Sequence, residues 1–287
     1  MGMLDEVILG GHISTSGGIY LSPERAAVFG FSSFQIFSKN QMQWKAKPIP
    51  PEDADKFVAG TRNGGFSKLM VHASYLLNMG TKDEELSAKV KNGLTEELRR
   101  ADQLQIDYLV VHPGSAAGTG ENSALRSISN MINSTFYDGM RVTLLLETAA
   151  GQGSTVGYRF EQLASMIDGV TEKKSVGICF DTCHVFASGY DIKSPNGYAE
   201  TFDQFDSVIG RKYLKGFHLN DSKKEMGSRV DRHEQIGKGQ LGLDGVSNFI
   251  NDERLRELPM ILETPSGEPG YPSDIKALES VFRMERI

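Results

Sequence analysis

The sequence predicts a (β/α)8 barrel, the TIM-barrel fold, formed by one domain over residues 1–287. Eight short apolar runs occur along the chain, and most are followed by a polar loop and then by a helix-compatible stretch. Eight such units in 287 residues match the number and size of this barrel. The second observation in favour of a barrel is that most of the runs are followed by histidine, aspartate or glutamate, the residue types that bind metals. An open doubly wound sheet is the alternative architecture.

The expected strands are the apolar runs themselves. Short runs that are apolar throughout are typical of parallel strands covered on both faces. In chain order, the runs occupy residues 8–13, 34–37, 68–71, 108–111, 142–146, 176–180, 213–217 and 260–262.

The expected helices fall between these runs. Ser22, followed by Pro23 and Glu24, is typical of a helix N-cap with proline at the first helical position. Residues 81–84 match a capping box that begins at Thr81. The longest helix is expected over residues 83–103, because apolar side chains recur there every three or four residues and form one face. These apolar residues are Leu86, Val90, Leu94, Leu98 and Ala101.

Composition indicates a soluble intracellular protein, which we expect to be cytoplasmic and monomeric. With 39% hydrophobic residues the chain can bury a substantial core, and no linker or low-complexity tract divides it. The acidic start is followed by an apolar stretch too short for a signal peptide, and no run approaches the roughly 20 residues that span a bilayer. Cys179 and Cys183 are expected to be buried, reduced thiols rather than ligands.

The net charge of −6 argues against nonspecific binding of nucleic acid, which normally shows a basic excess. That count omits any bound metal. Three divalent ions would add about six positive charges in one cleft. The acidic composition therefore does not exclude a partner that carries phosphates.

Five of the six histidines and four carboxylates follow the predicted strands or the loops after them. In a barrel the carboxyl ends of all strands converge on one face, so these side chains meet in a common bowl, whereas an open sheet would spread them in a line. Nitrogen and oxygen ligands of this mixture suit zinc, with manganese and iron as competitors. The nine candidate ligands are His72, His112, Glu147, Asp181, His184, His218, Asp231, His233 and Glu263.

Nine ligands exceed the needs of one catalytic zinc, which takes three from the protein and keeps one position open. Two or three metals are therefore expected. A multi-metal site with open positions suits in-line displacement at phosphorus, where the ions generate hydroxide and hold the attacking and leaving oxygens. A structural zinc cluster would be rich in cysteine, and this set has no obvious cysteine ligand.

Two loops are candidates for contact with a substrate. Residues 31–51 contain no acidic residue but carry lysines, including Lys39, around the only tryptophan, Trp44. Such interleaving favours phosphate contact and base stacking, although a solvated loop with Trp44 packed on the barrel is the alternative. After His72, the apolar Tyr75 and Leu76 could either cap the barrel or wedge between bases.

His12 is the one histidine without an assigned metal. It ends the first strand, faces the same bowl, and lies opposite the ligand cluster in strand order. His12 could support the metal ligands or the substrate, or it could be a histidine of the core.

The motifs around these residues resemble the endonuclease IV family of zinc-dependent apurinic/apyrimidinic endonucleases, over nearly the whole chain. All nine metal ligands of that family have a matching residue here. The matching segments are Lys39-Asn-Gln-Met-Gln-Trp44, His72-Ala-Ser-Tyr-Leu76, His112-Pro-Gly114, Leu146-Glu-Thr-Ala-Ala-Gly-Gln-Gly153, Asp181-Thr-Cys-His184, His218-Leu-Asn-Asp221, Arg229-Val-Asp-Arg-His233 and Leu262-Glu-Thr264.

The resemblance implies three zinc ions per chain and a DNA-repair activity. It implies that Glu147 bridges two ions, that His72 and His112 complete the first site, that Asp181, His218 and Glu263 complete the second, and that His184, Asp231 and His233 hold the third. Glu147 and Glu263 are the residues it marks as catalytic. The implied reaction is attack by a zinc-bound hydroxide on the phosphodiester 5′ to an abasic site in double-stranded DNA, which leaves a 3′ hydroxyl and a 5′ deoxyribose phosphate. Trimming of blocked 3′ ends is also implied.

The resemblance also implies DNA contacts at Lys39, Met42, Tyr75 and Leu76. Members of the family insert side chains into a bent duplex, and Tyr75 and Leu76 match two of these. Where relatives carry arginine at another inserting position, this chain has Met42, which can wedge between bases but offers no charge.

Two rival functions make different predictions. A metal-dependent sugar isomerase of the same barrel class would have two metals, more carboxylates and a lysine in the barrel mouth, whereas five histidines favour hydrolysis by zinc. A noncatalytic protein that binds damaged DNA would have no reason to keep open metal positions.

Overall fold

The computed structural model describes Leu4 and residues 6–283, so most of the acidic start lies outside the described residues. Eight parallel strands form one sheet in the order β1-β10-β7-β6-β5-β4-β3-β2. A parallel bridge between His12 and Gln35 joins β1 to β2 and brings the sheet almost to closure. The strands are β1 (Leu9–Gly11), β2 (Gln35–Phe37), β3 (Met70–His72), β4 (Tyr108–Val111), β5 (Thr143–Glu147), β6 (Val176–Asp181), β7 (Leu214–His218) and β10 (Met260–Leu262).

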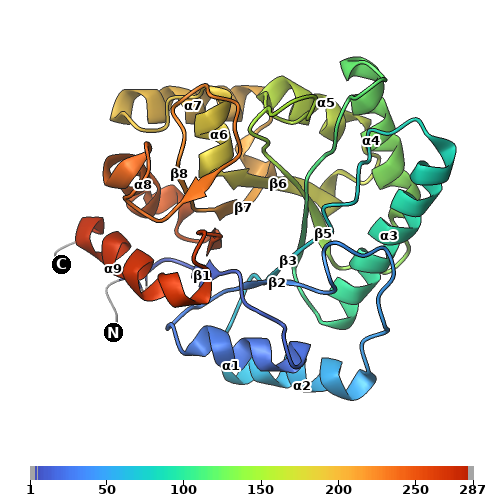
Figure 1. Cartoon of the computed structure of the whole chain (residues 1–287), viewed down its shortest axis with the longest axis horizontal. Coiled ribbons are helices and arrows are strands. Elements are labelled where there is room, and N and C mark those ends of the chain that lie inside the picture. The colour runs from blue at the N-terminus through green and yellow to red at the C-terminus, as the bar shows by residue number, and fades with distance from the viewer. Residues whose placement is uncertain (1–3, 5, 284–287) are drawn as a thin grey trace.

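The predicted barrel is therefore confirmed, and the open sheet was the wrong alternative. Helices surround the strands, as Figure 1 shows. In the described residues these are α1 (Ser22–Ala27), α2 (Pro51–Asn63), α3 (Glu84–Gln103), α4 (Glu121–Thr135), α5 (Phe160–Gly169), α6 (Thr182–Ser188), α7 (Pro195–Val208), α8 (Gly242–Ile250) and α9 (Tyr271–Val281). None of them is both long and apolar enough to cross a membrane.

The core has two layers. A small cluster from β3, β4, β5, β6 and β10, which includes Met70, Leu145 and Cys179, is separate from the larger layer between the strands and helices. Gly216 on β7 makes room for this small cluster, since a Cβ there would lie 2.2 Å from the Met70 Cε. Cys179 and Cys183 are both buried and free, as expected.

Four strands end one residue later than their apolar runs, three end with them, and β1 ends two residues earlier. His72, Glu147, Asp181 and His218 are the last residues of their strands, although each is polar. The chain stays extended through them because the parallel ladder continues, for example between Asp181 and His218. The apolar pattern therefore locates each strand but misses the polar residue that ends it.

Helix α3 occupies the predicted range to within one residue, but its expected N-cap, Thr81, was wrong by two residues. The N-cap is Asp83, whose carboxylate accepts a hydrogen bond from the Leu86 backbone N–H. Thr81 instead accepts from the Asp83 N–H through its hydroxyl. Ser22 likewise does not cap α1, because a 3-10 turn over Ile19–Leu21 precedes it.

One element was not expected from the sequence. Strands β8 (Asp221–Ser222) and β9 (His233–Glu234) form a separate antiparallel pair that projects from the barrel after β7. Each strand has only two residues and no apolar run, so no alternating pattern marks it. This hairpin carries two of the candidate ligands into the site.

Candidate metal centre

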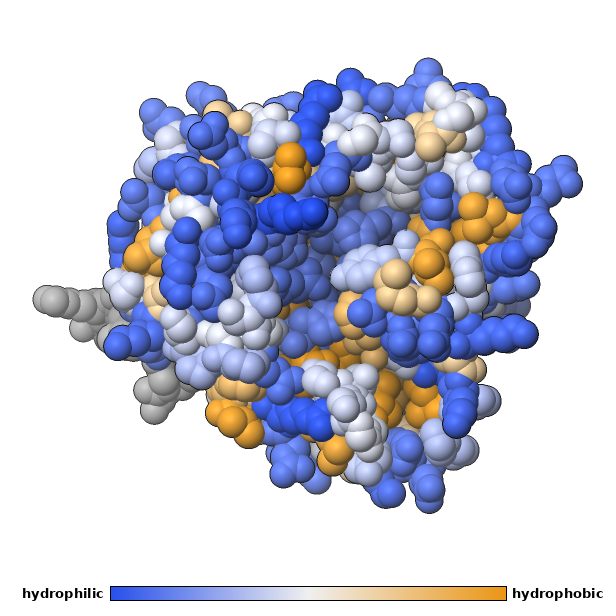
Figure 2. Space-filling view, viewed as in Figure 1, coloured by the Kyte–Doolittle hydropathy of each residue, from blue (hydrophilic) through white to orange (hydrophobic). Residues whose placement is uncertain are grey.

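Six of the nine candidate ligands stand at the carboxyl ends of barrel strands. Four are the last residues of β3, β5, β6 and β7, and His112 and Glu263 directly follow β4 and β10. Neighbouring parallel strands are about 4.8 Å apart, so consecutive strand ends bring their side chains within reach of one another. The face seen in Figure 2 is hollowed at its centre, over the barrel strands of Figure 1, and hydrophilic residues surround the hollow.

The other three ligands come from segments that follow strands β6 and β7 rather than from the strand ends. His184 lies in the first turn of α6, and its backbone N–H donates to the Asp181 carboxylate at 2.8 Å. That N-cap bond holds His184 beside the end of β6. Asp231 and His233 arrive on the hairpin of β8 and β9.

The donor atoms gather into three groups that match the sets expected from the resemblance. The first is His72, His112 and Glu147, the second is Glu147, Asp181, His218 and Glu263, and the third is His184, Asp231 and His233. Within each group the donor atoms lie within 4.8 Å of one another. Glu147, which is almost fully buried, belongs to two groups and so stands between them.

Cys183 also approaches this cluster, in a group with Asp181 and His233. Its thiol donates to the carbonyl of Arg232 at 3.5 Å. Burial raises the pKa of Cys183, so the thiol remains protonated near neutral pH. A metal ligand must be a thiolate, and the expectation that Cys183 is a buried thiol agrees with these contacts.

Each of four histidines has one ring nitrogen hydrogen-bonded to an oxygen outside its metal group. A carbonyl oxygen can only accept, so that nitrogen carries the proton and the other nitrogen offers a lone pair to the group. The oxygens are Ala73 O for His72, Thr148 O for His184, Glu263 O for His233 and Gln35 Oε1 for His218, at 2.8, 2.8, 3.0 and 2.9 Å.

When these histidines are neutral, as metal binding requires, their inward nitrogens face carboxylate oxygens, lone pair against lone pair. His72 Nε2 lies 3.2 Å from Glu147 Oε2, His218 Nδ1 lies 2.9 Å from Glu147 Oε1, and His184 Nε2 lies 3.2 Å from Asp231 Oδ1. Such contacts repel unless a proton or a metal ion lies between the atoms. Two ligand atoms of a tetrahedral zinc lie about 3.3 Å apart when its bonds are about 2.0 Å long.

The third group shows the need for a cation most directly. His184 Nε2 and His233 Nε2 lie 3.5 Å apart, and both rings have their other nitrogen on a carbonyl. A proton satisfies one such nitrogen, whereas a divalent ion satisfies every member of a group at once. The donor set and its spacing thus fit zinc ions.

The histidines and carboxylates of the cluster shift one another's pKa values, so that each type favours the charged form of the other. Burial alone would raise the pKa of Glu147, but the surrounding histidines hold it well below its ordinary value. Burial likewise opposes ionisation of Asp231, yet the hydrogen bond and charge of His184 lower the pKa of Asp231 to about 2. The acidic groups around His184 and His218 outweigh burial and hold the pKa of both rings well above the ordinary value.

Metal binding should therefore release protons. The raised pKa values of His184 and His218 mean that both rings hold a proton more readily than an ordinary histidine in the metal-free protein, and both must be neutral to bind zinc. We expect zinc binding to release protons, and the zinc affinity to weaken as the pH falls, because protons then compete with zinc for these rings. Calorimetry in buffers of different ionisation enthalpy measures the release, and zinc affinity that does not change with pH would contradict it.

Two supporting residues were missed by the sequence reasoning. The Gln35 amide donates to Glu263 Oε1 at 2.6 Å and accepts from His218 through its oxygen. The Asn220 amide donates to Asp181 Oδ2 at 2.9 Å, and its oxygen accepts from the Glu263 N–H at 2.8 Å. Their polarity was the one signal in the sequence. Gln35 interrupts the apolar run 34–37, and Asn220 lies three residues after the run 213–217.

His12 does not lie opposite the ligands, as strand order had indicated, because near-closure of the barrel makes β1 the neighbour of β10. Its Nδ1 lies 3.3 Å from Glu263 Oε1 and 3.0 Å from Gln35 Nε2. Burial lowers the pKa of His12. His12 therefore supports a candidate ligand.

The four predicted DNA contacts have different surroundings. Met42 is 64% exposed and Tyr75 54% exposed, while Leu76 is half-buried. The Tyr75 ring packs against His72 and His112, with centroids 5.4 and 5.8 Å apart, so it stands at the edge of the first metal group.

Lys39 does not have the position expected of a phosphate contact. Its side chain is buried, and its ammonium group lies 3.5 Å from Glu96 and 3.6 Å from Glu97. Trp44 is half-buried and packs against the hydrophobic core. The structure thus favours the packed alternative for Trp44, and two carboxylates of α3 neutralise the Lys39 charge.

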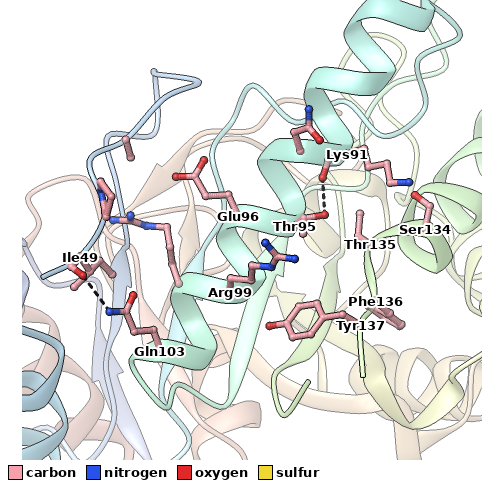
Figure 3. A pocket seen from close by; sticks show the side chains of 14 residues that line it. Ile49, Lys91, Thr95, Glu96, Arg99, Gln103, Ser134, Thr135, Phe136 and Tyr137 are labelled. Atoms are coloured by element: carbon pink, nitrogen blue, oxygen red, sulfur yellow. Dashed lines mark hydrogen bonds between the residues drawn. The ribbon is translucent and has the colours of Figure 1, made fainter. Parts of the chain in front are cut away.

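A pocket of about 760 Å³ lies away from this centre, on the outside of the barrel. Figure 3 shows its walls, in which Thr95 and Arg99 of α3 face Thr135 and Tyr137 near the end of α4. A second pocket, of about 370 Å³, adjoins the metal centre and is lined by His12, Phe37 and the start of the loop that carries Met42.

Comparison with known proteins agrees with the resemblance. The family model for the xylose isomerase-like TIM barrel matches residues 23–281. A probable endonuclease 4 of Chloroflexus aurantiacus is 46% identical over 261 residues, which cover 90% of this chain and 92% of that protein. One of Thermoplasma volcanium is 44% identical over 268 residues, which cover 93% and 92%.

Among solved structures, endonuclease IV from Thermus thermophilus superposes with a TM-score of 0.85 at 32% identity. The match covers 95% of this chain and 98% of that one. Sequence motifs, barrel architecture and near-complete coverage all agree. The chain belongs to the endonuclease IV family within the xylose isomerase-like TIM barrels.

Proposed function

We propose that this protein is a DNA-repair endonuclease that hydrolyses the phosphodiester 5′ to an abasic site in duplex DNA. The products would be a 3′ hydroxyl and a 5′ deoxyribose phosphate, and blocked 3′ ends would be trimmed at the same centre. Membership of the endonuclease IV family supports the reaction class. The observation that carries the proposal is the gathering of histidine nitrogens and carboxylate oxygens into three donor groups, two of which share Glu147.

Three zinc ions are the cofactor we propose, one for each group. When bound, they supply Lewis acidity at the phosphoryl oxygens and lower the pKa of an attacking water. Glu147 contributes one oxygen to each of two groups and fixes their separation. Its oxygens approach His72 and His218 at 3.2 and 2.9 Å.

The remaining residues hold this set in place. Gln35 and His12 fix the Glu263 carboxylate, and Asn220 fixes Asp181, so these acids keep their orientation when a substrate enters. Preorganised charge of this kind lowers the barrier because it does not have to rearrange during the reaction. Three divalent ions would also offset about six negative charges, which equals the chain's net charge of −6.

The duplex is proposed to contact the loops beside the first group. Tyr75 and Leu76 would wedge at the abasic gap, since Tyr75 is exposed and its ring adjoins His72 and His112. Met42 would add an apolar contact without charge. Lys39 is left out of this contact set because its ammonium group pairs with carboxylates of α3.

The test is metal-dependent nicking of a duplex that contains one abasic analogue. We expect protein loaded with about three zinc ions to cut only the damaged strand, and chelation to abolish the cut until zinc is restored. Metal analysis on the same sample gives the ion count, and an undamaged duplex is the control. A zinc-loaded protein that leaves the abasic duplex intact and isomerises a sugar would be the rival isomerase. One that binds the duplex without cutting it would be the noncatalytic binder.

Three further expectations from the sequence stay predictions. They are the single-domain organisation over residues 1–287, the monomeric state and the cytoplasmic location.

A further inference from the structure

The two loops that carry the exposed candidate DNA contacts are joined to each other. We call residues 38–47 the Met42 loop and residues 73–77 the Tyr75 loop. The Ser74 hydroxyl donates to the Gln41 carbonyl at 2.6 Å. This bond links the residue before Tyr75 to the residue before Met42, so the positions of the two exposed side chains depend on each other.

A single buried carboxylate on α3 accepts hydrogen bonds from both loops. Glu97 is only 1% exposed. Its Oε2 accepts from the Ser38 hydroxyl at 2.7 Å, and its Oε1 accepts from the Ser74 backbone N–H at 3.2 Å. Ser38 begins the Met42 loop and Ser74 belongs to the Tyr75 loop, so Glu97 bonds to one end of each.

Two cations secure the same carboxylate. The Lys39 ammonium lies 3.6 Å from Glu97 and donates to the Trp44 carbonyl at 3.4 Å. Arg100 donates to the Ser38 hydroxyl at 3.0 Å and to the Lys47 carbonyl at 2.9 Å. The Met42 loop is thus held near both of its ends by charges that Glu97 balances.

Burying such a carboxylate costs free energy, and burial accordingly raises the pKa of Glu97. Contacts with Lys39, Ser38, Ser74 and Arg100 oppose that rise but do not cancel it. None of the metal donor groups found among the described residues contains Glu97. A loop that becomes ordered only when DNA binds loses conformational entropy, and that loss weakens the affinity. The buried Glu97 contacts would avoid this loss by ordering both loops before DNA binds.

We propose that Glu97 is a positioning residue that fixes the Met42 loop against the Tyr75 loop and so sets the affinity for damaged duplex DNA. This inference rests on the proposed function. It assigns to α3 a role in substrate binding that is separate from the metal chemistry. Glu97 touches neither the substrate nor the metal donors and acts through Ser38 and Ser74.

The test compares Glu97→Gln with Glu96→Gln. A glutamine at position 97 has one accepting oxygen where two are needed, and it leaves the buried Lys39 without its buried partner. Glu96 also lies 3.5 Å from Lys39, but its side chain is 36% exposed, and it lines the outer pocket in Figure 3. It is therefore the matched control.

We expect Glu97→Gln to raise the KM for nicking an abasic duplex about tenfold, with kcat changed less than about twofold and zinc content unchanged. Glu96→Gln should change KM less than about twofold. A lower kcat at unchanged KM, or equal effects of the two substitutions, would overturn the inference.

The only tryptophan gives a readout that needs no DNA. Trp44 lies within the Met42 loop, so acrylamide should quench its fluorescence more strongly in Glu97→Gln than in the wild type or in Glu96→Gln. If the wild type fails to nick DNA, the proposed function fails, and Trp44 still reports whether Glu97 anchors the loop. Equal quenching in all three proteins would exclude the anchoring.

Should Glu97→Gln fail to fold, Ser74→Ala takes its place. It keeps the Ser74 N–H on Glu97 but removes the hydroxyl's two bonds, to the Gln41 carbonyl and from the Leu76 N–H. A smaller rise in KM in the same direction, with stronger Trp44 quenching, supports the inference. Unchanged values of both exclude it.

Discussion

Replacing Glu147 with glutamine is expected to lower the rate of abasic-site nicking by about a thousandfold while the barrel stays folded. Glu147 is shared by two donor groups, and its two oxygens approach His72 and His218. A glutamine amide carries no charge, and its nitrogen presents hydrogens where a lone pair is needed. Single-turnover nicking, measured with zinc content and a circular dichroism melt, tests this directly.

The control for this substitution is Glu121→Gln. Glu121 is a half-exposed residue at the start of α4 that pairs with Arg159, and none of the metal donor groups found among the described residues contains it. It should leave both nicking and zinc content unchanged. Normal turnover by Glu147→Gln would remove the bridging role proposed for this residue.

The second large effect is expected for stability, at Asp221. This carboxylate is fully buried and accepts four backbone N–H bonds, from Ser222 at 2.7 Å, Gly239 at 2.9 Å, Leu241 at 3.0 Å and Gly242 at 3.1 Å. Asp221→Ala leaves these donors without an acceptor. We expect the free energy of unfolding to fall by about 3–5 kcal/mol, as when one partner of a buried charged network is removed.

Urea unfolding of the metal-free protein measures this change without interference from zinc. The exposed Asp203 is a suitable control, and its replacement with alanine should cost less than about 0.5 kcal/mol. Because Asp221 begins the hairpin that carries Asp231 and His233, the variant should also lose zinc from the third group first. A loss of less than about 1 kcal/mol would mean that water replaces the carboxylate.

The sequence was sufficient to predict the barrel, because each strand is marked by an apolar run of neighbouring residues. Each apolar run is a strand, and His72, Glu147, Asp181 and His218 follow from the ends of those runs. The elements that depend on distant contacts were not predictable in this way. The hairpin of β8 and β9 has strands of two polar residues each, so no pattern marks it.

Lys39 shows the same limit within the candidate site. A basic loop without acidic residues predicts an exposed phosphate contact, but the carboxylates that neutralise Lys39 come from Glu96 and Glu97, more than fifty residues later. Gln35 was missed for a related reason. One glutamine in an apolar strand has no periodic signal, and its contacts with His218 and Glu263 arise only when the barrel brings both ends of the sheet together.

The seam between β1 and β2 has a thermodynamic consequence. A single bridge between His12 and Gln35 joins the two strands, and the side chains of the same two residues hold Glu263. Ion binding and sheet closure are therefore linked, because a ligand that binds only the closed form stabilises it. Bound zinc would therefore favour the closed form of the barrel. Backbone amides along the seam should exchange with solvent more slowly once the ions are bound, whereas those between β5 and β6 should barely respond.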